Sequence, residues 1–409
     1  MQTLLTSEII LTFLALSLLL LSSFVGGKLF EYIKAPKVVG EIFGGMVLGA
    51  SCLGFIFPHF FSTVFVGYPE EGKILNVFYQ LGLVFLMFSS GFNANISIGK
   101  NNAQNYGLLF FGATVIPMLL GLIFPRIFED AFIGTAMNRQ AYILVFIIAV
   151  AITSIPVISK IFFDIGMMNT KFSNMVLTVS TLQDLCLWIL LNLAIGLVET
   201  GTFDLITSLI TTAITIGLLF GVRLLGVLVR KKKIVITKNV LPISFLVSFI
   251  TIYILSKFNI NIMYSSFISG CIMKSILSSE STKEIEKIKD FSFSLFVPIY
   301  FALVGIQLDV IHHFSLLRFC LFFVIAFGLE MIGTTGMMLL SSLKKKTALS
   351  LGITMNARGG PGIVLATTAY SYNIISLEFF AVLILTTMLS STIAGYWLRR
   401  FREDIQNDG

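Results

Sequence analysis

The sequence predicts an all-α membrane protein of about 13 transmembrane helices. Of its 409 residues, 56% are hydrophobic and only 12% are charged, whereas a soluble domain carries charge on about a quarter of its residues. The apolar residues gather in runs of about 20, the length of helix that crosses a hydrocarbon core of about 30 Å. Basic residues lie mostly between these runs and favour every second connection.

The apolar runs follow one another with short polar connections. A backbone in lipid satisfies its own hydrogen bonds only in a helix or a closed barrel, and these runs are too long and continuous for barrel strands. The first run lacks the basic start and the small-residue cleavage site of a signal peptide. The expected spans are 8–27, 36–56, 73–92, 105–124, 140–163, 172–198, 203–229, 238–256, 259–278, 291–309, 314–341, 347–370 and 375–398.

Lysine and arginine residues alternate between the two sides of the predicted membrane. Of the 28 lysine and arginine residues, 21 lie in or beside the loops that follow odd-numbered spans and 5 lie in the other loops. The remaining two, Arg223 and Arg358, lie inside spans. Because basic residues collect on the cytoplasmic side, we expect the C-terminus inside and the N-terminus outside. The protein is therefore expected to be multi-pass in the plasma or inner membrane, and its net charge of +7 requires no nucleic-acid partner.

The spans divide into two groups of six within a single transmembrane domain covering 1–409. We expect a first repeat at 8–198, a linker helix at 203–229 and a second repeat at 238–398. Because equivalent spans are seven apart, and seven is odd, the two halves have opposite orientations. Residues 399–409 are expected to form a short cytoplasmic tail, and the charged stretch 279–290 a short surface helix.

The fifth and twelfth spans are interrupted at matching positions. Thr153-Ser154-Ile155-Pro156 breaks the fifth, and Asn356-Ala357-Arg358-Gly359-Gly360-Pro361-Gly362 breaks the twelfth. Proline removes a backbone donor and glycine holds a helix poorly, so both spans are expected to be discontinuous. Paired broken helices in inverted halves indicate a transport site near the middle of the membrane.

Asp184 lies in the middle of the sixth span, where a charge is costly and indicates function. A buried carboxylate can hold a desolvated cation or a proton but not both at once, which is the competition that exchange requires. Its neighbour Gln183, and the hydroxyls and carbonyls of Thr153 and Ser154, offer further oxygen ligands for a monovalent cation. The alternative is a structural role, with a protonated Asp184 that donates a hydrogen bond to a backbone carbonyl.

Three further polar residues lie inside late spans: Glu330 in the eleventh, and Asn356 and Arg358 in the break of the twelfth. Arg358 is expected to compensate the C-terminal ends of half-helices that converge there. Glu330 has two equal interpretations. It lies near Asp184, where two carboxylates cannot both ionise cheaply, or it pairs with Arg358 in a structural bridge.

Glu41 and the cysteines carry weaker signals. Glu41 lies near the cytoplasmic end of the second span and is expected to serve helix packing beside Gly40, Gly44 and Gly45 rather than the ion path. The cysteines lie far apart in apolar segments without metal-ligand spacing, so neither a disulfide framework nor a metal centre is expected. They are Cys52, Cys186, Cys271 and Cys320.

Six motifs in order resemble the second family of monovalent cation:proton antiporters, which includes Kef-type potassium efflux systems, bacterial sodium/proton antiporters and plant cation/proton exchangers. The resemblance covers nearly the whole chain, and Gln183-Asp184 is similar to the Kef-type form of the acidic motif. The matching segments are 35–42, 47–49, 153–156, 183–184, 296–305 and 351–359.

The resemblance implies the sodium/proton antiporter fold, with six-helix inverted repeats and two crossed broken helices. It also implies a homodimer in which a scaffold domain, formed partly from the early spans, supports a moving core domain. Asp184 would carry both ions, Na⁺ or K⁺ and H⁺ would be the substrates, and neither enzymatic activity nor a cofactor is expected.

Glu330 departs from the family pattern, because many members have a lysine there. A glutamate can supply a proton but not a salt bridge to Asp184, so the stoichiometry and the electrogenicity stay open. The alternative function is a K⁺ efflux pathway without strict proton coupling. Cation movement driven by a pH gradient alone distinguishes exchange from that alternative.

Overall fold

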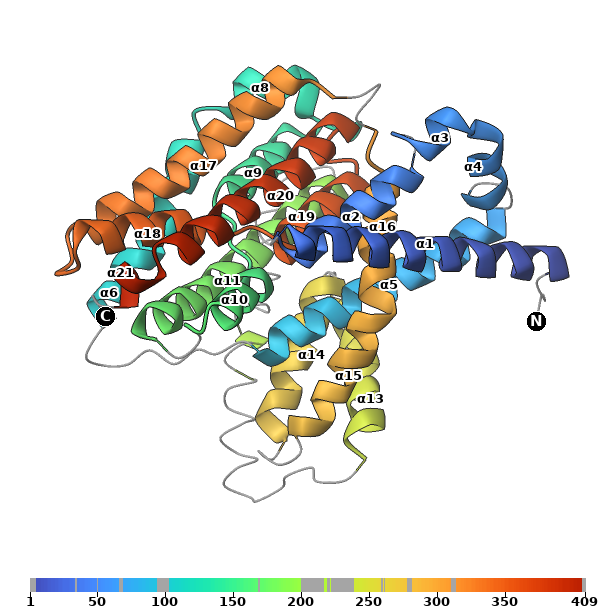
Figure 1. Ribbon diagram of the computed structural model, residues 1–409, viewed down its shortest axis with the longest axis horizontal. Coiled ribbons are helices and arrows are strands. Elements are labelled where there is room, and N and C mark those ends of the chain that lie inside the picture. Colours follow the sequence, from blue (N-terminus) through green and yellow to red (C-terminus); the bar gives the residue numbers. More distant parts are fainter. Residues whose placement is uncertain are drawn as a thin grey trace. The chain divides into compact units, whose positions relative to one another are not determined.

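The computed structural model is helical throughout the residues that it describes, apart from connections and one isolated bridge between Ile133 and Ile375 (Figure 1). Every predicted span except the linker at 203–229 corresponds to one helix or to two or three consecutive helices. The linker falls almost entirely outside the described residues. The described residues are 5–33, 35–49, 51–65, 69–93, 103–167, 170–199, 217–218, 221, 239–258, 260, 262–277, 282–309 and 314–406.

The chain forms two compact units, each built from a piece of both halves of the sequence. The first unit contains residues 1–93 and 213–312, and the second contains residues 94–212 and 313–409. All the candidate residues at the two breaks, and Asp184 and Glu330, belong to the second unit. The first unit is therefore described only briefly.

In the first unit, α2 packs between α1 and α16 with glycine at the contacts. A Cβ atom on Gly40 would lie 2.2 Å from the carbonyl oxygen of Gly26, and one on Gly45 would lie 2.0 Å from that of Ala302, so only glycine permits these approaches. Glu41 is buried beside them, 3.2 Å from the ammonium of Lys37. The helices are α1 (Thr6–Tyr32), α2 (Lys37–Leu48), α3 (Leu53–Ile56), α4 (Pro58–Phe65), α5 (Pro69–Asn93), α13 (Val240–Ser256), α14 (Ile262–Ile276), α15 (Thr282–Ser294) and α16 (Phe296–Ile306).

The charged stretch at 279–290 was predicted to be a short surface helix, and α15 confirms the helix with Glu284 and Lys287 paired at 3.2 Å. Only Leu295 separates α15 from α16, so the tenth span begins as the continuation of this helix. The charged residues of its first turns hide that continuation in the sequence, although Ile285 and Ile288 among them are buried.

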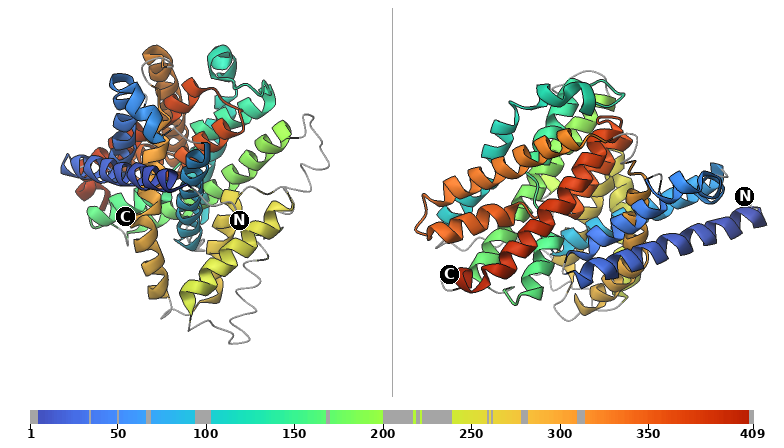
Figure 2. Two further views of the ribbon diagram at one scale, coloured as in Figure 1. Left: turned by 90° about the vertical axis from the view of Figure 1, so that its right-hand side faces the viewer. Right: turned by 45° about the horizontal axis from the view of Figure 1, so that its top comes forward.

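The second unit surrounds the two interrupted spans. Its α17 and α20 run alongside each other in Figure 2 and contact directly. The helices are α6 (Ala103–Phe110), η2 (Phe111–Val115), α7 (Ile116–Gly121), α8 (Pro125–Phe132), α9 (Arg139–Val150), α10 (Ile155–Asp164), α11 (Lys171–Glu199), α17 (Leu316–Met338), α18 (Lys345–Met355), α19 (Gly360–Ser371), α20 (Leu377–Arg400) and α21 (Arg402–Gln406).

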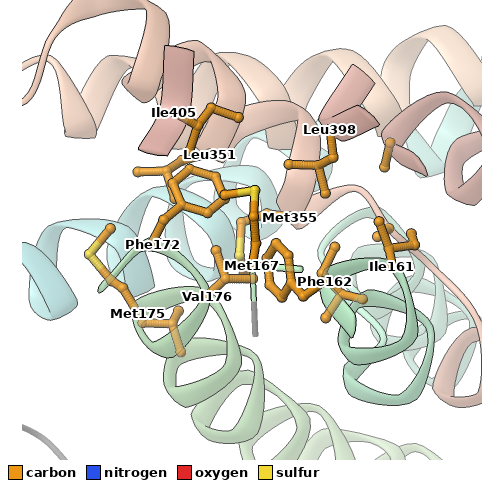
Figure 3. Close-up of a cluster of buried hydrophobic side chains, with 14 of the residues drawn as sticks. Ile161, Phe162, Met167, Phe172, Met175, Val176, Leu351, Met355, Leu398 and Ile405 are labelled. Atoms are coloured by element: carbon orange, nitrogen blue, oxygen red, sulfur yellow. The ribbon is translucent and has the colours of Figure 1, made fainter. Parts of the chain in front are cut away.

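An apolar cluster joins α10, α11, α18 and α20 next to the break after α18, and Figure 3 shows it closely. Met355, the last residue of α18, and Phe162 of α10 are both fully buried in it. The segment expected to be a tail contributes α21, whose Ile405 is 2% exposed within the same cluster. Asp404 lies 3.3 Å from Lys346, which further ties α21 to the start of α18.

Within the described ranges, eight helices are long and apolar enough to cross a membrane, and three shorter apolar helices accompany them. The difference from the predicted number has three causes. Each broken span consists of two short helices, α9 with α10 and α18 with α19. The spans predicted at 238–256 and 259–278 are the shorter helices α13 and α14, and the linker span falls almost wholly outside the described residues. The protein is thus a multi-pass membrane protein.

Candidate functional site

The two broken spans meet at their breaks. The N–H of Ser154 donates to the carbonyl of Ala357 at 2.7 Å, and the hydroxyl of Thr153 donates to the carbonyl of Met355, which ends α18. Residues 151–154 between α9 and α10 therefore replace the helical bonds that α18 loses at its C-terminus. Both spans are broken as predicted, and the two breaks contact each other through backbone groups that sequence alone could not match.

Glycine is required where the breaks touch. A Cβ atom on Gly359 would lie 2.5 Å from Oγ of Ser154 and 2.3 Å from a methyl group of Val157, which is closer than real Cβ contacts allow. The following helix α19 begins at Gly360 with Pro361 in its first turn, where proline loses no helical hydrogen bond. The glycine-proline run thus ends one helix, admits a close neighbour and starts the next helix.

Arg358 and Glu330 form an ion pair inside this crossing. Nη2 of Arg358 lies 3.1 Å from Oε2 of Glu330, and the two side chains are 1% and 0% exposed. The same nitrogen donates to the carbonyl of Val150, the last residue of α9, at 2.9 Å. Arg358 therefore lies at the C-terminus of α9, and its compensation of half-helix ends stays a prediction.

The ion pair extends to neighbouring polar groups. Oγ1 of Thr153 lies 3.3 Å from Oε1 of Glu330, and Nη2 of Arg358 lies 3.5 Å from Oδ1 of Asn356. Among the described residues, Glu330 interacts with Arg358 and no interaction joins it to Asp184. The geometry thus favours the structural bridge over a shared proton site.

Gln183 ties two other segments to α11. Its Nε2 donates to the carbonyl of Ala113 at 3.0 Å and to that of Ala151 at 2.7 Å. Pro117 has no N–H to donate to the carbonyl of Ala113 four residues earlier. The side-chain amide of Gln183 donates to that carbonyl instead. The π-helical turn η2, which surrounds Ala113, was not predicted, although Pro117 was the available signal.

Asp184 lies one residue further along α11 and is 1% exposed. Neither of its carboxylate oxygens has a hydrogen-bond partner in the described part of the chain. The structural alternative, a bond from Asp184 to a backbone carbonyl, is therefore not observed. The side chain lines a small cavity that is too tight for a water molecule, together with Trp188 and six apolar side chains, among them Ile152 and Pro361 from the two breaks. A carboxylate in such surroundings is stabilised by a bound proton or cation.

The structure thus gathers the candidate residues into two adjacent groups within one unit. Thr153, Arg358, Glu330 and Asn356 form one polar network at the crossing. Asp184 faces the cavity beside it, and no hydrogen bond links its carboxylate to Thr153 or Ser154 among the described residues. Trp188, one turn after Asp184, also lines the cavity.

Comparisons with known proteins agree on one family. The family model described as "Sodium/hydrogen exchanger, transmembrane" matches residues 17–403. The chain is 24% identical over 384 residues to Cation/H(+) antiporter 19 of Arabidopsis thaliana, covering 88% of this chain and 46% of that protein. It is also 24% identical to Na(+)/H(+) antiporter NhaS4 of Synechocystis sp., covering 90% of this chain and 92% of that one.

A solved structure has the same fold. The sodium proton antiporter MjNhaP1 of Methanocaldococcus jannaschii superposes with a TM-score of 0.67 at 14% identity, covering 98% of this chain and 99% of its own. The chain spans about half the length of the Arabidopsis relative.

Proposed function

Because the chain belongs to the transmembrane sodium/hydrogen exchanger family, we propose that it exchanges a monovalent cation for protons by alternating access around Asp184. The observation that carries the proposal is the environment of that side chain. It is a fully buried carboxylate without a hydrogen-bond partner among the described residues, and it faces a cavity beside the contact of two broken helices. Such a group is stable when it holds a proton or a cation and costly when it holds neither.

The remaining residues have supporting roles in this proposal. Thr153 and Ser154 supply oxygen atoms near the path of the cation, whereas Arg358 and Glu330 neutralise the crossing and hold it together. Because their charges cancel, the pair adds no net charge beside the carrier. Gln183 keeps α11 in place against the fifth span rather than binding the ion.

The substrates proposed are Na⁺ or K⁺ together with H⁺, and no cofactor is involved. The protein is proposed to act as a homodimer in the plasma or inner membrane, with its N-terminus outside. The first compact unit, which contains the early spans, is the candidate scaffold, and the second unit, which contains Asp184, is the candidate moving core.

Reconstitution into proteoliposomes with a pH-sensitive dye inside tests the proposal. Addition of Na⁺, K⁺ or Li⁺ in turn to acid-loaded vesicles is expected to alkalinise the lumen for at least one of them. A pH gradient alone is expected to drive uptake of that cation. Cation flux that ignores the pH gradient and moves no protons would contradict exchange and support an uncoupled pathway.

A further inference from the structure

Helix α11 places an indole beside the candidate carrier carboxylate. Asp184 and Trp188 are four residues apart, so their side chains project from the same face of the helix. Both line the same cavity, and Trp188 is only 4% exposed. The two side chains therefore share one buried space.

Each of them has an unpaired polar group. The indole Nε1–H of Trp188 has no hydrogen-bond partner within the described residues, and neither carboxylate oxygen of Asp184 has one. A buried indole N–H normally finds an acceptor, because leaving it unpaired costs free energy. The indole N–H of Trp188 is a hydrogen-bond donor, and the carboxylate of Asp184 is an acceptor.

Among its described lining residues, the cavity offers no other side-chain partner to either group. The remaining lining residues have apolar side chains without hydrogen-bonding or titratable groups; they are Ile148, Ile152, Leu187, Leu191, Pro361 and Leu365. They come from α9, from the break that follows it, from α11 and from α19. Among the residues that the structure describes, Asp184 is therefore the only titratable side chain that lines this space.

We propose that the indole N–H of Trp188 donates a hydrogen bond to the carboxylate of Asp184 when that group holds neither proton nor cation. This inference rests on the proposed function and makes Trp188 a positioning residue that sets the pH range of exchange. A neutral donor stabilises the bare carboxylate without competing with the cation as a fixed positive charge would. It binds only one oxygen and leaves the other free for the incoming ion.

The substitution Trp188→Phe tests the role, because it removes the N–H and keeps an aromatic ring in the cavity. Loss of the donor makes the bare carboxylate costlier, so protons are released only at higher pH. The pH of half-maximal exchange should move towards alkaline by about 1 unit, as expected for one hydrogen bond to a charged group. A residue that only fills space would leave this pH unchanged.

The second tryptophan of the chain provides a matched control. Trp397 donates through its Nε1 to the hydroxyl of Ser350 at 3.1 Å, so Trp397→Phe also removes an indole N–H from the same compact unit. That variant should keep the wild-type pH profile. Because the sequence has two tryptophans, the tryptophan emission of the Trp397→Phe protein comes from Trp188 alone.

Fluorescence of the Trp397→Phe protein then reports on the proposed contact directly. Emission from Trp188 should change across the pH range of exchange, and Asp184→Asn in the same background should abolish the change. This measurement keeps Trp188 in place, so it remains decisive if Trp188→Phe fails to fold or if the wild type moves no ions. Lack of exchange by the wild type would overturn the proposed function, whereas pH-independent emission, or an unmoved pH profile in an active Trp188→Phe protein, would overturn the role of Trp188.

Discussion

The buried ion pair gives the most demanding prediction for stability. In Glu330→Gln the carboxylate that faces Arg358 at 3.1 Å becomes a neutral amide, and the guanidinium is left as an uncompensated charge at 1% exposure. Removing one partner of a buried pair commonly costs about 3–5 kcal/mol. We expect about 3 kcal/mol, because an amide oxygen can still accept from Nη2 and the bond to Val150 remains.

The same substitution in an exposed pair is the control. Arg318 and Glu378 lie in the same unit at 2.8 Å with side chains 47% and 15% exposed. Surface pairs contribute about 0–1 kcal/mol, so Glu378→Gln should change stability little. Thermal unfolding in detergent, monitored by size-exclusion chromatography, compares Glu330→Gln with Glu378→Gln. On the scale of soluble domains, about 3 kcal/mol corresponds to a fall in Tm of roughly 6–12 °C.

A rescue experiment separates the ion pair from other causes. Arg358→Leu in the Glu330→Gln background removes the unpaired charge and should recover part of the lost Tm. Glu330→Lys, although lysine is common here in the family that the sequence resembles, would place a second cation beside Arg358 and should be worse than glutamine. A Glu330→Gln protein with the wild-type Tm and yield would refute the reasoning.

Three further substitutions test the crossing. Thr153→Val should weaken apparent cation affinity five- to tenfold, about 1 kcal/mol, with less effect on maximal rate, and an unchanged cation dependence in flux assays would remove its hydroxyl from the site. Gln183→Leu leaves two buried carbonyls without its amide and should cost about 2 kcal/mol in thermal unfolding, whereas a neutral result would show that the amide bonds do not matter. Gly359→Ala should lower Tm and expression, because its methyl group would lie 2.3 Å from Val157 and overpacking commonly costs about 1–3 kcal/mol. A Gly359→Ala protein of normal stability would mean that the two breaks can move apart.

The helices were predictable because their signals are local. An apolar run of about 20 residues has one solution in lipid, and the charge alternation checks the number of runs. The breaks were predictable for the same reason, since Pro156 and the run from Gly359 to Gly362 act on their own backbone. The linker at 203–229 and the repeat symmetry remain predictions.

The partners of the polar side chains were not predictable. Sequence gave Glu330 two equal interpretations, because nothing local fixes whether Arg358 or Asp184 is the nearer charge. Gln183 was assigned to the ion from its place beside Asp184, yet its Nε2 is engaged by the carbonyls of Ala113 and Ala151 from two other segments. Such contacts depend on how distant helices pack, which the hydrophobic pattern does not specify.

The central claim is that one carboxylate carries both ions, and proton release on cation binding tests it most directly. Purified protein in weakly buffered detergent is mixed with the cation that proves active in vesicles, and the pH is recorded. The wild type and the exposed control Asp130→Asn should release protons as the cation binds. Asp184→Asn should remain folded and release none. Cation-dependent proton release that persists in Asp184→Asn would contradict the account.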